Sequence, residues 1–313
     1  MRSRENANQD LEATMNEVLN VLEARFPGLY ANIEKMLVEA EAQYNAQTGK
    51  ASSEFLLEHT LRTAAIAHKI SAMEGVDSFL PSLVALYHDA GKFHAGVYHN
   101  DGIPEEEHAA LLAEKMLTRF GLEPSDIETV LIALRAMYNQ RLPCIGPSRI
   151  AQDADQLDKL GTLGVAAFFT KAALRGSGLV DALVQTLSRE LTYALAAPRS
   201  MFTETGKKLA AEQAARTITF FDDLLEQLES WGIASFERHT ILLKDDFHSR
   251  DGTIVRDMEV TIAMLRACPD CKGPLALTHA REQGIKCDRF TAHFKCGGCS
   301  YTSKTSLCLP LVA

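Results

Sequence analysis

The stretch Phe79–His94 reads FLPSLVALYHDAGKFH, and it predicts a buried helix that ends in two potential metal ligands. Apolar residues run almost without interruption up to Tyr87, and Gly91 supplies a helix stop because glycine tolerates the left-handed conformation. His88 and Asp89 would then lie in the last helical turn. Neighbouring helical residues point about 100° apart, so two of them can hold one ion only at a helix end or in a cleft between helices. The remaining ligands must therefore come from other helices.

Two further helical segments offer such ligands. Residues 54–67, EFLLEHTLRTAAIA, contain His59, and residues 149–161, RIAQDADQLDKLG, contain Asp155 at the edge of an apolar stripe. Mixed imidazole and carboxylate ligands suit manganese, iron, zinc, nickel or cobalt. They leave open positions on the metal for water and for a substrate oxygen.

The order of these residues resembles the HD superfamily of metal-dependent phosphohydrolases, over residues 50–175. The resemblance rests on a helical histidine, then HDAGK, then DADQLDKLG. It implies one divalent transition metal (manganese, iron, zinc, nickel or cobalt) bound by His59, His88, Asp89 and Asp155. Asp155 fits better than Asp153, because the last ligand of the family usually follows a small residue and precedes a polar-leucine pair. Asp153 remains the alternative.

The resemblance also implies roles in catalysis. Asp89 would orient the attacking water, and Lys92 would neutralise phosphate charge. Arg62 and Lys159 are expected to assist Lys92, although both fit equally well as solvated residues on helix surfaces.

Some members of the superfamily hold a second metal with additional histidines. Here His94, His99 and His108 are available, and His108 lies in the helical segment EEEHAALLAEKML. The next segment, LRAMYNQR, lacks the histidines that two-metal members place there. One metal is therefore favoured, with His108 as a further ligand, a phosphate contact or an ordinary surface histidine.

The chain as a whole predicts a mainly α fold, a multi-helix HD-domain bundle with a small C-terminal zinc ribbon that contains β-structure. Apolar residues recur at helical spacing from about residue 10 to 240, where we find no alternation typical of strands. We expect N-terminal helices at 1–48 packing on the core, a helical phosphohydrolase domain at 49–243 and a zinc-ribbon-like domain at 251–313. Short β-prone runs, LALTHA and RFTAHFKC, occur in the last of these.

Two C-x-x-C knuckles mark the C-terminal module. Four thiolates at this spacing close a tetrahedral structural zinc site, and glycines beside the second pair allow a turn whose amides point at sulfur. A redox pair is the competing interpretation. The zinc ligands are expected to be Cys268, Cys271, Cys296 and Cys299. Cys287 is a plausible fifth thiol that a tetrahedral site does not need, and Cys144 and Cys308 are expected to be unligated.

Composition narrows the functional class. The net charge is −9, and no run of 18 apolar residues follows the charged N-terminus or occurs elsewhere, so we expect a cytoplasmic protein without a membrane segment. From Lys244 onward there are 10 basic against 8 acidic residues, so this tail carries +2. Such a charge is too weak to favour nucleic acid as a partner. A homo-oligomer is a further expectation.

We therefore expect a metal-dependent hydrolase of a phosphate ester or anhydride, acting on a phosphorylated small molecule such as a nucleotide. The alternative is a nucleotide-sensing regulatory protein whose ribbon contacts nucleic acid or a protein partner. Phosphate release from a nucleotide panel with added manganese would separate the two.

Overall fold

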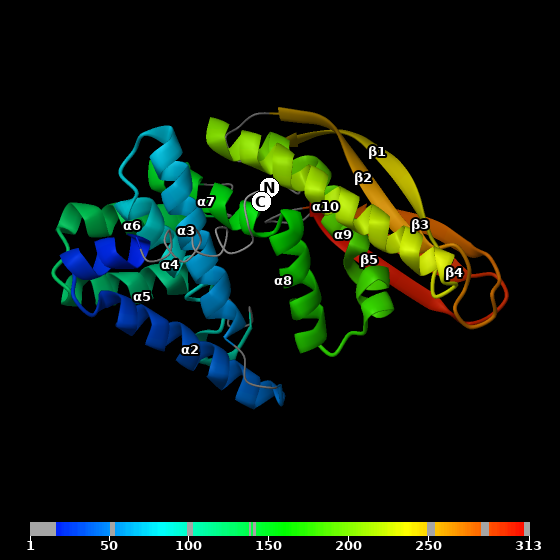
Figure 1. The fold of residues 1–313 in the computed structure, drawn as a ribbon, viewed down its shortest axis with the longest axis horizontal. Helices are drawn as coiled ribbons and strands as arrows, with labels where there is room; N and C mark the ends of the chain where they lie inside the picture. The colour runs from blue at the N-terminus through cyan, green and yellow to red at the C-terminus, as the bar shows by residue number, and fades with distance from the viewer. Residues whose placement is uncertain are drawn as a thin grey trace, which may run out of the picture. The chain divides into compact units, whose positions relative to one another are not determined.

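Helices make up most of the chain, and antiparallel strands follow them near the C-terminus in the computed structural model (Figure 1). The structure describes residues 17–50, 54–98, 103–137, 139, 142–248, 254–282 and 288–309. The helices are α2 (Leu29–Thr48), α3 (Phe55–Glu74), α4 (Phe79–Tyr87), the 3-10 turn η1 (His94–Gly96), α5 (Glu105–Arg119), α6 (Pro124–Ala136), α7 (Gly146–Asp158), α8 (Gly161–Leu174), α9 (Leu179–Ser200) and α10 (Glu204–Ser230). The strands are β1 (Phe236–His248), β2 (Ile254–Leu265), β3 (Leu275–Glu282), β4 (Asp288–Cys296) and β5 (Thr302–Leu309). The mainly α fold is confirmed.

The chain divides into two compact units. The first comprises residues 1–158 and 202–206, and the second comprises residues 159–201 and 207–313. The domain boundaries expected at residues 49, 243 and 251 are limits of segments that would fold independently. The division into two units does not test independent folding, so these boundaries stay predictions. Each unit is described below by itself.

The core of the first unit is built around α4. This nine-residue helix is apolar on nearly every side, and such a helix is stable only when neighbours cover it all round. Helices α3, α5, α6 and α7 supply that cover. Within the described part of the chain, no helix is long and apolar enough to cross a membrane.

Helix α7 is also buried, although its sequence is polar. Gln152, Asp153, Asp155, Gln156 and Asp158 are all buried. Buried polar groups cost free energy unless they are hydrogen-bonded or paired, so their partners reveal what the helix does. Asp153 shows one use. Its carboxylate accepts hydrogen bonds from the backbone N–H groups of residues 202 and 203, each at 2.8 Å, and thereby fixes this segment to the first unit.

The second unit contains two antiparallel sheets. Strands β1 and β2 form a hairpin that pairs Phe236 with Leu265 and His248 with Ile254. The other sheet has the order β3-β4-β5, in which β4 is the central strand. Helix α9 packs against both β2 and β5 (Figure 1).

Strand β2 is buried on both faces. Val260, Ile262 and Met264 face one apolar cluster with Phe290 of β4, and Ala263 faces another with helices α8 and α9. Hydroxyl groups of α9 also bond to the β2 backbone, because Ala263 N–H donates to Ser188 Oγ at 2.9 Å. Since an unpaired strand edge invites aggregation, this contact protects β2.

Strand β1 corrects the expectation that residues up to about 240 are helical. It starts at Phe236, and from residue 237 to 244 half-buried and exposed side chains alternate as in a strand. The sequence does not show a matching alternation of apolar and polar residues, because the apolar residue Leu242 lies on the solvent side, with 47% of its surface exposed. Strand structure therefore begins earlier than the sequence indicates.

Candidate metal centre

Three helices that pack against one another bring together the residues expected to bind metal. His59 lies within α3, His88 and Asp89 directly follow α4, and Asp155 lies on α7. Helices α3, α4 and α7 all contact each other. The surrounding core thus fixes the four side chains, although up to 96 residues separate them in the sequence.

The four side chains converge on a small volume. His59 Nε2 lies 3.3 Å from His88 Nε2, 3.3 Å from Asp155 Oδ1 and 3.6 Å from Asp89 Oδ2. His88 Nε2 lies 3.6 Å from Asp89 Oδ1 and 3.8 Å from Asp155 Oδ1. His59, His88 and Asp89 also form a mutually close group suited to hold a metal ion. Asp153 points to the segment at 202–203 instead, which favours Asp155 as the fourth ligand.

The second ring nitrogens of both histidines are already engaged. His88 Nδ1 lies 2.7 Å from the carbonyl oxygen of Ala85, and His59 Nδ1 lies 2.7 Å from Asp158 Oδ2. Since both partners are acceptors, each Nδ1 carries the proton, and a neutral ring then presents a lone pair at Nε2. Two lone pairs and two carboxylates thus face one another.

The pKa values of three of these side chains depart from their usual values, each for a different reason. Burial raises the pKa of Asp89, but Lys92 and the two histidines more than offset this and hold it below its usual value. Burial lowers the pKa of His88, which favours the neutral ring. For His59, burial also lowers the pKa, yet hydrogen bonds with Asp155 and Asp158 raise it above its usual value. The raised pKa of His59 thus shows that the carboxylates around this ring favour a positive charge there.

Gly91 differs from its predicted role as a left-handed helix stop. It is absent from the residues with positive φ, and α4 already ends at Tyr87. A Cβ atom at this position would lie 2.1 Å from the carbonyl oxygen of Glu105 and 2.8 Å from His108 Cβ. Glycine is thus needed here because the start of α5 packs directly on the backbone that follows Asp89.

The expected phosphate-binding residues have different surroundings. The Lys92 ammonium donates a hydrogen bond to Asp89 Oδ2, and a quarter of its side chain is exposed. Arg62 donates from Nε to Asp158 Oδ1 at 2.7 Å and from Nη2 to Asp158 Oδ2 at 3.0 Å. Lys159 belongs to the second unit. Phosphate contacts by Lys92, Arg62 and Lys159 stay predictions.

Two of the histidines considered for a second metal, His94 and His108, lie outside the group of mutually close ligands. The rings of His94 and His108 stack with centroids 3.8 Å apart, and His108 packs close to Gly91. His99 lies outside the described residues. The expectation of a single metal stays a prediction.

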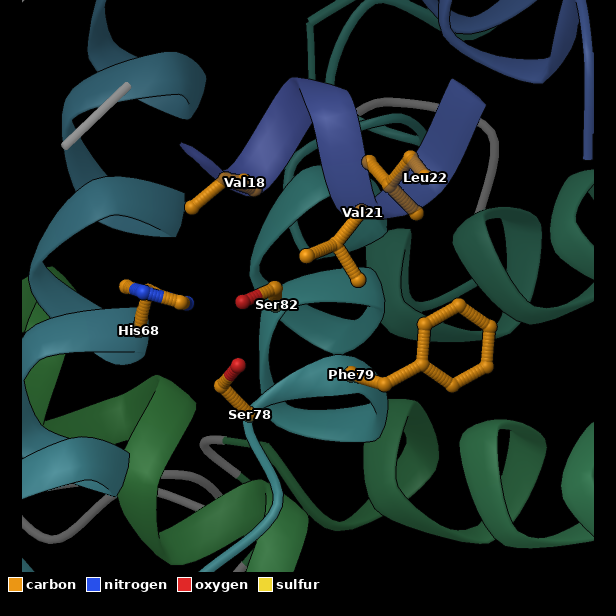
Figure 2. Close-up of a pocket in the computed structure, with 7 residues that line it drawn as sticks. All are labelled: Val18, Val21, Leu22, His68, Ser78, Phe79 and Ser82. Carbon is orange, nitrogen blue, oxygen red and sulfur yellow. The ribbon is translucent and has the colours of Figure 1, made fainter. Parts of the chain in front are cut away.

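A pocket in the first unit lies apart from these ligands. Figure 2 shows Val18, Val21 and Leu22 on one helix, with His68 of α3 and residues 78, 79 and 82 at the start of α4 around the same pocket. None of its lining residues is a candidate ligand, so we assign it no role in metal binding.

Four cysteines form a second candidate metal site in the second unit. Cys268 and Cys271 follow β2, whereas Cys296 ends β4 and Cys299 follows it. The sulfur of Cys268 lies 3.5 Å from that of Cys299, and that of Cys271 lies 3.4 Å from that of Cys296. Thiolates that share one zinc at about 2.3 Å lie about 3.8 Å apart in tetrahedral geometry. The spacing therefore fits a zinc-ribbon-like module.

The backbone around these sulfurs also fits metal-bound thiolates. The Gly298 N–H donates to Cys296 Sγ at 3.3 Å and lowers the pKa of that thiol to about 7. A Cβ atom on Gly273 would lie 3.3 Å from Cys271 Sγ, so the turn brings backbone close to sulfur. The expected turn, with an amide aimed at sulfur, is therefore present.

The remaining cysteines lie apart from the four-sulfur cluster or beyond what the structure describes. Cys144 is buried, and its thiol lies 3.7 Å from the carbonyl oxygen of Ala136. Cys287 and the side chain of Cys308 lie outside the described part of the chain.

Asp158 is the residue of the centre that the sequence analysis did not single out. It lies within the quoted DADQLDKLG segment, three positions after Asp155 and hence on the same face of α7. This three-residue spacing could have indicated from the sequence that Asp158 lies beside the candidate ligand Asp155. The contacts of Asp158 with His59 and Arg62 could not be predicted, because they depend on how α3 packs on α7.

A family model for the HD domain matches residues 56–160, which include all four candidate ligands and Asp158. The match confirms the HD resemblance for this segment. No curated protein matches the chain significantly.

Several solved structures are similar to this chain. One is a predicted HD superfamily hydrolase from an uncultured Thermotogales bacterium, with 24% identity, coverage of 67% of this chain and 98% of that one, and a TM-score of 0.48. Another is YpgQ from Bacillus subtilis in complex with ADP, with 21% identity, 64% and 96% coverage and a TM-score of 0.45. A third is an HD-superfamily hydrolase from Bacillus thuringiensis, with 19% identity, 64% and 99% coverage and a TM-score of 0.46.

Proposed function

We propose that the first unit binds one divalent transition metal and hydrolyses a phosphate ester or anhydride. The observation that supports this proposal most directly is the convergence of nitrogen and oxygen atoms from four side chains, His59, His88, Asp89 and Asp155, in a buried centre. Acceptor atoms repel one another at 3.3–3.8 Å unless a positive charge lies among them.

The donor set fits such an ion. Ligand atoms about 2.0–2.2 Å from a shared metal lie about 3.0–3.5 Å apart, close to the spacings in this centre. Two carboxylates balance a divalent charge, and the imidazoles favour manganese, iron, zinc, nickel or cobalt over calcium or magnesium. When bound, the metal would polarise a phosphoryl oxygen and lower the pKa of water.

The residues around the ligands supply the other functions that hydrolysis needs. Lys92 keeps Asp89 ionised and offers a positive charge to phosphate oxygens from a side chain that is partly exposed. Asp89 has two carboxylate oxygens, so it can contribute one to the metal and orient water with the other. The water oxygen bonds to phosphorus as the bond to the leaving oxygen breaks, and a proton ends on the leaving oxygen.

We further propose a nucleotide or nucleotide-like substrate, a proposal that rests on the HD resemblance alone. Phosphate release from a nucleotide panel, after chelation and addition of each metal, tests it. His88→Ala and Asp89→Ala should abolish turnover, whereas the control His239→Ala, a half-buried histidine on β1 in the second unit, should retain it. Activity that persists in both ligand variants would contradict the proposal. Metal-dependent nucleotide binding without turnover would favour a sensing role instead.

For the second unit we propose a structural zinc held by Cys268, Cys271, Cys296 and Cys299. The support is the tetrahedral sulfur spacing together with the amide of Gly298 directed at sulfur. A small β module gains folding free energy from such a metal. Elemental analysis of the purified protein should find zinc that is lost when these cysteines are replaced.

A further inference from the structure

A buried carboxylate lies directly behind one of the candidate metal ligands. Asp158 Oδ2 accepts a hydrogen bond from His59 Nδ1 at 2.7 Å, on the side of the ring opposite to the metal centre. The Asp158 side chain is only 2% exposed. Burying an ionised carboxylate costs folding free energy unless its oxygens are paired, so Asp158 needs a specific partner.

Arg62 is that partner. Its Nε and Nη2 atoms donate to the two oxygens of Asp158 at 2.7 and 3.0 Å, in a two-point arrangement that matches the planar guanidinium. Together with His59, the carboxylate thus accepts three hydrogen bonds. Because both oxygens are held, Asp158 cannot rotate away from His59 without losing at least one of these contacts.

The four residues form two matched pairs on facing helices. On α3, Arg62 follows His59 by three positions, and on α7, Asp158 follows Asp155 by three positions. Residues three apart lie on one helix face, so each helix presents one candidate ligand and one supporting residue. Packing of α3 on α7 therefore brings His59 to Asp155 and Arg62 to Asp158 at the same time.

We infer that Asp158, held by Arg62, is the positioning residue that fixes the His59 ring and its proton so that Nε2 is free to bind the metal. The inference rests on the proposed metal site. A neutral imidazole carries a proton on one nitrogen only, and a carboxylate at Nδ1 fixes it there. Support of this kind orients a ligand and increases its basicity.

This inference gives Arg62 a different role from phosphate binding. Two of its three guanidinium nitrogens donate to Asp158, and the third lies 3.9 Å from Glu58 Oε2. Only 17% of its side chain is exposed. Arg62 would thus act through Asp158 and His59, whereas Lys92 provides the charge for phosphate.

Asp153 provides a matched control on the same helix. It is as buried as Asp158, and it also accepts three hydrogen bonds, from Phe202 N, Thr203 N and Thr203 Oγ1. None of these donors is a candidate ligand. Asp153→Asn should therefore lower the stability of the protein but leave metal affinity within a factor of two or three.

The test combines manganese affinity with the protonation of His59. Calorimetric titration of Mn²⁺ into chelated full-length protein should show affinity about 10–100-fold weaker in Asp158→Ala, with Asp158→Asn between this variant and the wild type. Nitrogen-15 spectra of the metal-free protein, at a pH well above the ordinary histidine pKa of about 6.5, report which ring nitrogen is protonated. The wild type should carry the proton of His59 on Nδ1, with the signals assigned by their loss in His59→Gln.

The outcomes separate this inference from the proposed function. Tight binding by the wild type and equal binding by Asp158→Ala would overturn the positioning role while the metal site stands. A His59 proton on Nε2 in the wild type would overturn it even if Asp158→Ala fails to fold, since this readout needs no Asp158 variant. A wild type that binds no divalent metal would reject both proposals.

Discussion

Replacing Gly91 by alanine tests whether close backbone packing holds the metal ligands in place. The added Cβ would lie 2.1 Å from the carbonyl oxygen of Glu105, where real contacts are essentially never shorter than 3.0 Å. The backbone would therefore have to move by the difference, 0.9 Å. Because the nearest atoms include backbone at the start of α5, a side-chain rotation cannot relieve the clash.

The expected cost follows from two opposing effects. Overpacking in a well-packed interior typically costs about 1–3 kcal/mol, whereas exchange of glycine for alanine gains about 0.4–1 kcal/mol by restricting the unfolded chain. We expect a net loss of about 1–2 kcal/mol, and each kcal/mol lowers Tm by about 2–4 °C in a domain of this size. Ligand sets tolerate displacements of only about 0.5 Å, so metal affinity should fall by at least about tenfold.

Gly146→Ala is the matched control, because a Cβ atom there meets nothing within 4 Å and the residue does not have a positive φ. This change should leave stability unchanged or raise it. Thermal unfolding and Mn²⁺ titration of both variants provide the measurement. Wild-type Tm and affinity in Gly91→Ala would show that the backbone after Asp89 adapts freely, and the packing argument would be wrong.

Three further changes test other parts of the structure. Tyr87→Phe should leave the free energy of unfolding unchanged or raise it by about 1 kcal/mol, because the buried hydroxyl has no hydrogen-bond partner among the described residues. Denaturant titration measures this change. A loss above about 1 kcal/mol would show that a bound water or another group bonds to the hydroxyl. Cys268→Ser should remove zinc but not the metal of the first unit in elemental analysis, whereas loss of both would show that the sites are coupled. The hydrogen bonds from Thr205 lower the pKa of Glu74, so their contribution is present above the usual glutamate pKa and lost as pH falls below it. In Glu74→Gln, the free energy of unfolding should therefore fall less steeply as the pH is lowered into the acid range. The same pH dependence as in the wild type would refute this.

Local patterns in the sequence were sufficient to predict the helical character of the fold and to indicate two candidate metal sites. The apolar run before His88 is buried as a helix because its composition offers no polar face to solvent. The two C-x-x-C pairs come together because the strands between them are antiparallel and return the chain to its starting point. Such features depend on neighbours in the sequence, so they can be inferred from it.

Contacts between helices were decided only by the tertiary structure. The roles of Asp153 and Asp158 differ entirely, although the two residues are five positions apart in one polar segment. One faces residues 202–203, and the other faces His59 and Arg62. Helical spacing predicts which residues share a face, but which partner that face meets depends on the packing of distant segments.

Gly91 shows the same limit at a single residue. In the sequence, a glycine after an apolar helix indicates a left-handed stop, because this is the commonest local reason for glycine at such a position. The structure instead requires glycine because α5, which begins 14 residues later, packs against its backbone. The sequence thus indicated which residues are candidates to bind metal. The packing of α3, α4, α5 and α7 decided how they are held, since steric fit between distant segments leaves no local pattern.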